Sequence, residues 1–253
     1  MLESEKIIVP DIAPYNNFQW DREGFFHLDT LFSIHLKDDH PLAPFGYAYL
    51  VGLLNSKVLE FALRQKSTKL RGGYWRYKKQ YLEPLPIKLP STARERDLAA
   101  RIEERVQAIM AAREVEGRLR RFPGSYAAGQ AAKVLEMRFL EDVDFPAAPR
   151  VEKGLFDEWS VTWGGRHSWT VGSEPAARFV AEALHRRGRV RHGDTVRVAL
   201  PADLDRAGQH YQADGRALEA NPPLKIEAEI DKLVLDLYGL SQAARQSIAE
   251  SVS

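Results

Sequence analysis

The spacing of hydrophobic residues changes part-way along this chain, and that change limits the folds it can adopt. Residues 1–48 hold short apolar runs separated by Pro, Gly, Asn and Asp, a pattern typical of short strands joined by turns. Residues 47–64 instead repeat apolar side chains at intervals of three and four, which predicts an amphipathic helix with one buried face. Strand character returns at residues 74–77, before a proline-rich extended segment. Residues 1–90 therefore predict an α+β domain.

Two later segments predict helices with one apolar stripe each. Residues 91–121 are rich in Ala, Glu and Arg, with Ser91 or Thr92 available to cap the first turn. Residues 224–238 carry Ile and Leu at spacings of four, three and four. Because each stripe needs a partner, we predict that the two helices pack together as an antiparallel pair.

The residues between these helices predict a small inserted α/β module. The expected elements are strands over residues 156–163 and 167–171 around a turn at Gly164-Gly165, a helix over 174–187 and a strand over 190–200. A polar, glycine-containing linker is expected just before Asn221. Three of the five tryptophans lie in the module, and core packing is the simplest interpretation of Trp159, Trp163 and Trp169.

Positive charge is concentrated in one run of the chain. Residues 61–81 contain seven Lys or Arg and no acid, interleaved with aromatic residues, although the formal net charge of the whole chain is only +1. Cations attract phosphates, aromatic rings offer flat faces to bases or sugars, and Gly72-Gly73 permits close approach of the backbone to a ligand. The run therefore indicates a nucleic-acid contact. A solvated strand with one half-buried face is the alternative interpretation.

Several segments also resemble a known family. The clearest are YLVGLLNSKVLEF at residues 49–61, LRGGY at 70–74 and YLEPLPI at 81–87, supported by KIIVPDI at 6–12 and IDKLVLDLYGL at 230–240. Together they resemble the TaqI-like C-terminal specificity domain, which is the target recognition module of adenine-specific DNA methyltransferases in restriction-modification and related phage-defence systems. The resemblance extends over about the first 120 residues and the last 30.

This resemblance and the hydrophobic pattern together imply the organisation of the chain. The expected fold is α+β, with a target recognition domain of short strands and helices, followed by the antiparallel helix pair carrying the inserted module. The predicted domains are a target recognition domain over residues 1–90, a spacer helix over 91–123, the inserted α/β module over 124–222 and a C-terminal helix over 223–253 that packs on the spacer helix.

The motifs of methyl transfer are missing from the sequence. The chain contains no FxGxG-type motif, which methyltransferases of this family use to bind S-adenosylmethionine. Residues 221–224 read Asn-Pro-Pro-Leu, and Leu224 stands where the catalytic Asn-Pro-Pro-aromatic motif has the ring that stacks on a flipped base. A turn that leads into the last helix is the better interpretation of these residues. We expect S-adenosylmethionine only on a methyltransferase portion or partner.

Nuclease and metal chemistry are not indicated either. None of the twelve Lys has an acid two residues before it, so Pro10-Asp11 lacks the rest of a restriction-nuclease motif. The seven His lack the spacing of a zinc pair and there is no Cys to accompany them, which makes surface histidine the better interpretation. We therefore predict no catalytic residue, no metal site and no enzyme activity for this chain alone.

The function predicted from these observations is a DNA sequence-specificity module. It would bind duplex DNA in the major groove, and a methyltransferase core in cis or in trans would be its partner. The candidate DNA-binding residues are Lys69, Arg71, Gly72, Gly73, Tyr74, Trp75, Arg76, Tyr77, Lys78 and Lys79. Weaker candidates for base contacts are Asn16, Asn17, Gln19 and Arg22, for which ordinary loop solubility is the alternative.

Two other classes of function fit the same sequence. A protein-interaction scaffold subunit would use the helix pair and the inserted module to bind partners. An accessory protein for RNA or single strands would stack unpaired bases on the aromatic residues of the run. The lack of Cys, of an apolar run near 18 residues and of a signal-peptide pattern predicts a soluble, cytoplasmic protein with no membrane partner, whether it stands alone or is a C-terminal fragment.

Overall fold

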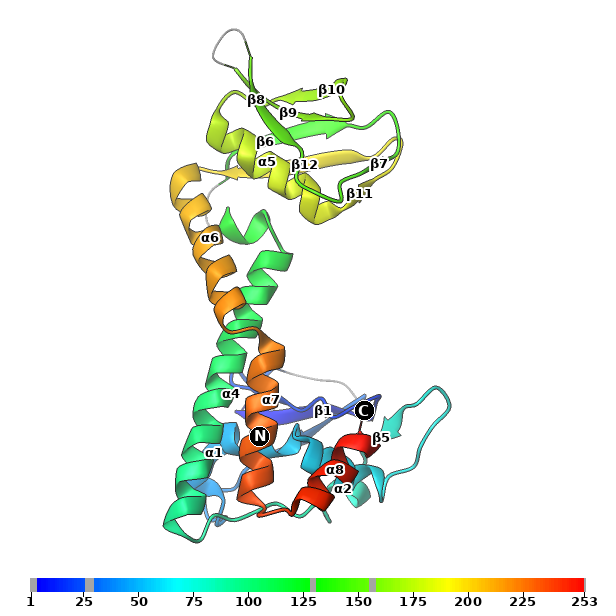
Figure 1. The fold of residues 1–253 in the computed structure, drawn as a ribbon, viewed down its shortest axis with the longest axis vertical. Helices are drawn as coiled ribbons and strands as arrows, with labels where there is room; N and C mark the ends of the chain where they lie inside the picture. Colours follow the sequence, from blue (N-terminus) through cyan, green and yellow to red (C-terminus); the bar gives the residue numbers. More distant parts are fainter. Residues whose placement is uncertain (1–3, 26–29, 128–130, 155–157, 253) are drawn as a thin grey trace. The chain divides into compact units, whose positions relative to one another are not determined.

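A computed structural model describes residues 4–25, 30–127, 131–154 and 158–252. The chain forms two compact units, which are unit 1, made of Met1–Ala111 and Pro222–Ser253, and unit 2, made of Ala112–Asn221 (Figure 1). Each unit mixes helices with small antiparallel sheets, so the predicted α+β class is confirmed. The four predicted domains and their boundaries stay a prediction. Within the described ranges, no helix combines the length and the apolar character that crossing a bilayer requires.

Unit 1 begins with the short strands that the sequence predicts. Strands β1 (Lys6–Pro10), β3 (Gln19–Asp21) and β4 (Leu31–Ile34) form an antiparallel sheet in the order β3-β1-β4. Strand β2 (Ile12–Ala13) pairs instead with β5 (Trp75–Arg76), which lies more than 60 residues further along the chain. The β2–β5 pairing therefore brings the start of the chain beside the basic run.

The predicted helix over residues 47–64 is wrong in one respect, because it is two helices. Helix α1 (Gly46–Leu54), which follows the short turn η1 (Ala43–Phe45), ends at Asn55, and α2 (Lys57–Arg64) begins after Ser56. The backbone of Ser56 is extended, and its hydroxyl caps α2 by accepting a hydrogen bond from the Leu59 N–H. The apolar spacing continues across the break, which is why periodicity alone does not reveal it.

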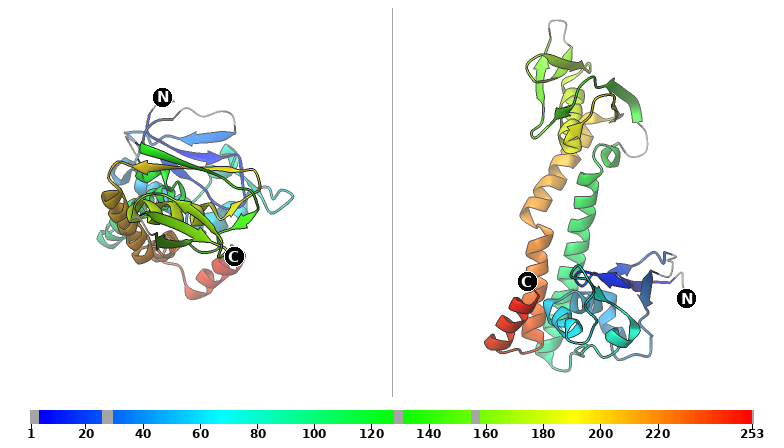
Figure 2. Two further views of the ribbon diagram at one scale, coloured as in Figure 1. Left: turned by 90° about the horizontal axis from the view of Figure 1, so that it is seen from above. Right: turned by 90° about the vertical axis from the view of Figure 1, so that its right-hand side faces the viewer.

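The predicted antiparallel helix pair is present, and most of it belongs to unit 1. Helices α4 (Ala93–Arg120) and α7 (Pro223–Leu237) lie side by side in both Figures 1 and 2. Ile102, Val106 and Ile230 are buried beside Gly52 of α1, where an added Cβ would lie 2.5 Å from the Ile102 side chain. Glycine at position 52 therefore lets α1 approach the pair closely.

Two short helices of unit 1 are not predicted by the sequence. Helix α3 (Lys79–Leu82) follows β5, and α8 (Gln242–Ser251) ends the described chain. Ser241 caps α8 by accepting a hydrogen bond from the Ala244 N–H, and α8 packs on α2, where the Arg64 guanidinium donates to the Ser251 carbonyl over 2.8 Å. The C-terminal segment is therefore tied to the domain at the start of the chain.

Among the described residues, unit 2 contains three small antiparallel sheets, several helices and the last residues of α4. Its strands are β6 (Ala131–Arg138) paired with β12 (Thr195–Pro201), β7 (Val143–Asp144) paired with β11 (Arg189–Val190), and β8 (Arg150–Lys153), β9 (Trp159–Trp163) and β10 (His167–Thr170) in the order β10-β9-β8. Its helices are α5 (Glu174–Arg187), α6 (Leu204–Ala220) and the short η2 (Gly124–Tyr126). One hydrophobic core, centred on α5, holds them together.

Several predictions for this unit are confirmed and two are wrong. The helix over residues 174–187 has the predicted bounds, and the two strands around Gly164-Gly165 are present, although Phe156 and Asp157 lie outside the described residues. The predicted strand over 190–200 is interrupted, because a turn with Gly193 at φ +86° separates β11 from β12.

The expected linker before Asn221 is the second wrong prediction, because these residues form helix α6. Asp203 caps α6 by accepting a hydrogen bond from the Arg206 N–H, and Asp214 is held by Arg118 and Tyr126. Such contacts stabilise a polar segment whose two glycines weaken its intrinsic tendency to form a helix.

The structure supports core packing for the three tryptophans of unit 2. Trp169 is buried in the hydrophobic core, and Trp159 and Trp163 are partly buried against it. Trp163 also stacks with Phe139, with ring centroids 5.5 Å apart. These rings therefore contribute to the packing that stabilises unit 2.

Candidate nucleic-acid interface

The centre of the basic run is a tight hairpin loop. Lys69 pairs with Trp75 across it, and the Leu70 N–H donates to the Tyr74 carbonyl over 2.7 Å. Gly72 and Gly73 form the tip, with φ values of +84° and +83°. Side chains are strained in this left-handed region, so both glycines are needed for the turn itself. Close approach to a ligand remains a prediction for them.

Arg76 is held more firmly than the other cations of the run. Its backbone pairs with Ile12 in β2. On the other side, the Ser67 hydroxyl accepts from the Arg76 N–H over 3.1 Å and donates to the Arg76 carbonyl over 2.7 Å. The guanidinium lies 3.1 Å from a carboxylate oxygen of Asp11, and the side chain is 33% exposed. Arg76 therefore presents a fixed guanidinium that remains accessible.

The structure shows which charges of the run are compensated. Although residues 61–81 contain no acid, carboxylates from elsewhere pair with three of the seven cations, in the pairs Arg64–Glu60, Arg76–Asp11 and Lys79–Glu83. The Lys79–Glu83 pair is largely exposed and stabilises little. Four cations form no salt bridge with any residue in the described part of the chain, and they are Lys66, Lys69, Arg71 and Lys78. The run therefore keeps a local excess of positive charge.

The aromatic residues of the run have different exposures. Tyr74 is 44% exposed at the hairpin, and Trp75 is half-buried, with the Lys69 ammonium and the Arg64 guanidinium 5.7 and 5.6 Å from its ring centroid. Tyr77 is completely buried, and its hydroxyl donates to the Asn16 side chain over 3.1 Å. Burial raises the pKa of Tyr77. Tyr77 therefore packs in the core next to β5 and does not offer the face of its ring to a ligand.

Asn16 likewise belongs to a buried polar network. Its side-chain amide donates to the Leu54 carbonyl over 2.5 Å, while its oxygen accepts the bond from Tyr77. Its own N–H bonds the carboxyl of Glu60, whose pKa is raised by burial although Arg64 opposes the shift. With 8% of its surface exposed and both polar atoms of its side chain hydrogen-bonded, Asn16 fixes the loop between β2 and β3. Direct base contact does not fit this burial.

Of the other weaker candidates, Asn17 precedes β3, Gln19 begins that strand and Arg22 directly follows it. Gln19 is exposed on β3, and its amide lies 3.4 Å from the Asn17 oxygen. Arg22 covers the Trp20 ring at 4.0 Å from the centroid. A buried ion pair of Lys6 with Asp21, at 2.8 Å, fixes the start of this loop. These residues share unit 1 with the hairpin but lie on or next to β3, which is in a different sheet from β5.

The residues of the LLNSK segment have structural roles that the sequence does not reveal. The Asn55 side chain donates to the Phe18 carbonyl over 2.7 Å and accepts from the Phe18 N–H over 2.8 Å. The Lys57 N–H donates to the Asp231 carboxylate of α7 over 2.8 Å. These bonds link the two helices to the loop after β2 and to the C-terminal helix.

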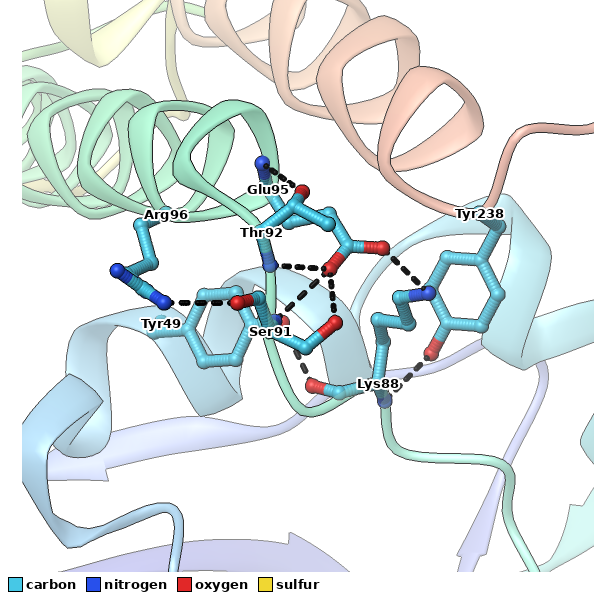
Figure 3. Close-up of polar contacts among 7 residues, drawn as sticks. All are labelled: Tyr49, Lys88, Ser91, Thr92, Glu95, Arg96 and Tyr238. Atoms are coloured by element: carbon cyan, nitrogen blue, oxygen red, sulfur yellow. Dashed lines mark hydrogen bonds and ion pairs between the residues drawn. The ribbon is translucent and has the colours of Figure 1, made fainter.

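A polar cluster fixes the segment that leads from the hairpin to α4 (Figure 3). Thr92 and Glu95 cap α4 reciprocally, since each accepts a hydrogen bond from the backbone N–H of the other, at 3.1 and 3.0 Å. The Lys88 ammonium lies 2.7 Å from Glu95 and holds the pKa of that carboxyl well below its usual range. The Tyr49 and Tyr238 hydroxyls bond the Lys88 backbone from α1 and from the end of α7. The predicted cap at Thr92 is confirmed.

Residues 222–224 start a helix, as the turn interpretation predicts. Pro222 is the cap of α7 and Pro223 is its first residue, where the missing N–H costs nothing. Leu224 is 77% exposed.

Sequence reasoning missed Asp11 and Ser67 as partners of Arg76. In the sequence, Asp11 is notable only as part of an incomplete nuclease motif, and Ser67 belongs to no recognisable motif. No local signal could pair them with Arg76, because the pairing of β2 with β5 depends on the tertiary fold.

Comparison with known families supports the resemblance seen in the sequence. Residues 1–87 match the family model of the TaqI-like C-terminal specificity domain. The matched region contains β1 to β5, α1 to α3 and the whole basic run, and it ends just before Lys88. The matched family is a specificity domain and not a catalytic one. No curated protein matches the chain.

Proposed function

We propose that this chain is the DNA sequence-specificity module of an adenine methyltransferase of a restriction-modification or phage-defence system. It binds duplex DNA, and methyl transfer belongs to a methyltransferase core in cis or in trans, which also carries S-adenosylmethionine. The observation that carries this proposal is the coincidence of the family match over residues 1–87 with a hairpin that keeps uncompensated cations around one fixed arginine. The proposal places the protein in the cytoplasm.

The proposed contacts follow from how each side chain is held. Arg76 is fixed, so it suits two-pronged reading of a guanine edge in the major groove. Lys69, Arg71 and Lys78 are exposed and suit phosphate contacts, which tolerate movement. Lys79 contributes less because Glu83 lies beside it.

The aromatic and polar candidates divide by exposure. Tyr74 can stack or pack against sugar, and Gly72-Gly73 lets the tip enter the groove. Asn17, Gln19 and Arg22 remain candidates for a second contact. Asn16, Trp75 and Tyr77 hold the surface in place.

Binding measurements at two salt concentrations test the proposal. The full chain, with its methyltransferase partner where one is required, is titrated with duplex DNA, single-stranded DNA and RNA. Preference for duplex, with affinity that falls as salt rises, supports the module. Preference for unpaired strands would favour the single-strand accessory function, and weak binding to all three without regard to sequence would favour the scaffold. Saturable binding of S-adenosylmethionine to this chain alone, measured by calorimetry, would contradict the proposal that only the methyltransferase core binds this cofactor.

A further inference from the structure

Asp11 occupies a fixed position beside the arginine that we propose to read DNA. Its backbone is held on both sides, because its N–H donates to the Thr30 carbonyl over 3.0 Å and its carbonyl accepts from the Tyr77 N–H over 2.8 Å. One carboxylate oxygen pairs with Arg76. The other is buried, without a hydrogen-bond partner among the described residues. The fold therefore holds the carboxylate in one position, whereas a carboxylate on an open surface could rotate freely.

The ion pair leaves most of the Arg76 guanidinium available. A guanidinium has five N–H donors, and Asp11 uses only the NH1 edge, at 3.1 Å. The side chains of Arg76 and Asp11 are 33% and 26% exposed. A ligand that approaches the hairpin therefore meets a guanidinium of set orientation with a negative charge next to it.

Resting on the function proposed above, we propose that Asp11 is a positioning residue that determines specificity. Its carboxylate holds Arg76 in the orientation that reads a guanine and keeps the same guanidinium from binding any phosphate that comes near. A negative charge facing DNA weakens binding to every sequence, whereas a fixed guanidinium strengthens binding to the right one. Asp11 therefore lowers overall affinity and raises discrimination.

Glu83 provides a matched control for this charge. It also pairs with a cation of the run, Lys79 at 3.3 Å, but both side chains are largely exposed and neither is fixed by a strand. Asp11→Asn and Glu83→Gln each remove one negative charge beside the hairpin with little change of shape. Electrostatics alone predicts the same result for both variants, and positioning predicts a difference.

The experiment uses the full chain with its methyltransferase partner and two probes, a duplex selected from a randomised library and a random duplex. Both variants should bind the random duplex more tightly than wild type and raise the salt slope by up to about one. Only Asp11→Asn should lower the ratio of selected to random affinity, by at least about fivefold, since a well-placed arginine–guanine pair provides about 1 to 3 kcal/mol of discrimination. Equal ratios for the two variants would overturn the proposal.

Two further variants keep the test decisive if Asp11→Asn folds poorly. Asp11→Glu keeps the charge but displaces Arg76, so discrimination should fall while random-duplex affinity stays at the wild-type value; unchanged discrimination would contradict positioning.

In an Arg76→Ala background, Asp11→Asn should cost no further discrimination, and an additional loss would show that Asp11 does not act through Arg76. If Arg76→Ala itself leaves duplex binding unchanged, the proposed function fails at this site, and that result is distinct from failure of the Asp11 role.

Discussion

Residues 64–79 of unit 1 and 186–191 of unit 2 are both rich in cations, but the fold treats them differently. In unit 2, three of the four arginines of the stretch are paired: Arg186, Arg187 and Arg189 lie 2.8, 3.6 and 3.4 Å from carboxylates of Glu182, Asp194 and Asp142. In unit 1, four of the seven cations have no such partner among the described residues. The comparison teaches that a basic stretch of sequence forms a positively charged surface where the fold places fewer carboxylates than cations nearby.

The two regions also differ in how their arginines are supported. Arg76 lies in a strand whose backbone is bonded on both edges, beside an exposed tyrosine and a glycine turn. Arg186 and Arg187 instead end helix α5, where cations favourably face the carbonyl end of the helix. We therefore expect DNA to be bound by the first region, and the second to stabilise its own unit.

The largest expected effect comes from breaking the helix pair α4–α7, which shares unit 1 with the hairpin. Ile230 and Leu233 are each 7% exposed on α7, so changing both to Asp buries charge and should destabilise unit 1 by several kcal/mol, about 3 to 5 or more. Thermal melting should show that unit 1 is unfolded or melts at a lower temperature. A DNA titration should show that duplex binding is lost. Leu224→Asp, on the exposed side of the same helix, is the control and should melt like wild type.

Arg76→Ala should give the next largest effect, because it removes the fixed guanidinium. The loss is expected to be about 1 to 3 kcal/mol of discrimination at one position of the recognised site, measured by competition among duplexes. Arg189→Ala in unit 2 is the matched control and should leave discrimination unchanged. Equal losses in the two variants would remove the distinction between the regions.

Lys78→Ala should weaken binding to all duplexes alike. One fewer counterion is then released, so the slope of log affinity against log salt should fall by about one. Arg187→Ala, whose side chain already faces Asp194 at 3.6 Å, should keep the wild-type slope. A wild-type slope for Lys78→Ala would mean that this cation faces only solvent.

The smallest effect is a difference in pH dependence between two carboxylates, one in each unit. Hydrogen bonding from Arg118 lowers the pKa of Asp214, so its contribution to stability is present above the unfolded pKa and is lost as pH falls. Burial raises the pKa of Asp231, so its contribution is present below the unfolded pKa and is lost as pH rises.

Hydrogen exchange of each unit between pH 3 and 7 measures this difference. From acid to neutral pH, wild type should gain stability relative to Asp214→Asn in unit 2 and lose it relative to Asp231→Asn in unit 1. If the two variants changed stability with pH in the same direction, the opposite pKa shifts of Asp214 and Asp231 would be contradicted.

Elements with strong local signals could be predicted from the sequence. The bounds of α5 follow from Ser173 before it and Gly188 after it, which cap its two ends. The cap of α4 follows from Thr92 and Glu95 in the same way. By contrast, α6 has two glycines and few large apolar residues, and Asp214 stabilises it by bonding Arg118 and Tyr126, which lie far away in the chain.

The candidate site was predictable only in part. The glycine turn and the local excess of charge can be read directly from residues 69–79, and the family resemblance from residues 49–87. The burial of Tyr77 and Asn16, and the pairing of Asp11 with Arg76, depend on β2 meeting β5 across more than 60 residues. Periodicity contains no information about such a pairing, so the sequence alone could not separate the residues that face a ligand from those that support them.

The most direct test of the central claim is hydrogen exchange of the full chain with and without saturating duplex DNA, with the methyltransferase partner present where binding requires it. We expect duplex to slow exchange of the backbone N–H groups at residues 69–79 and to leave residues 186–191 unchanged. Protection at 186–191 with none at 69–79 would contradict the claim that the hairpin of unit 1 is the DNA-binding surface.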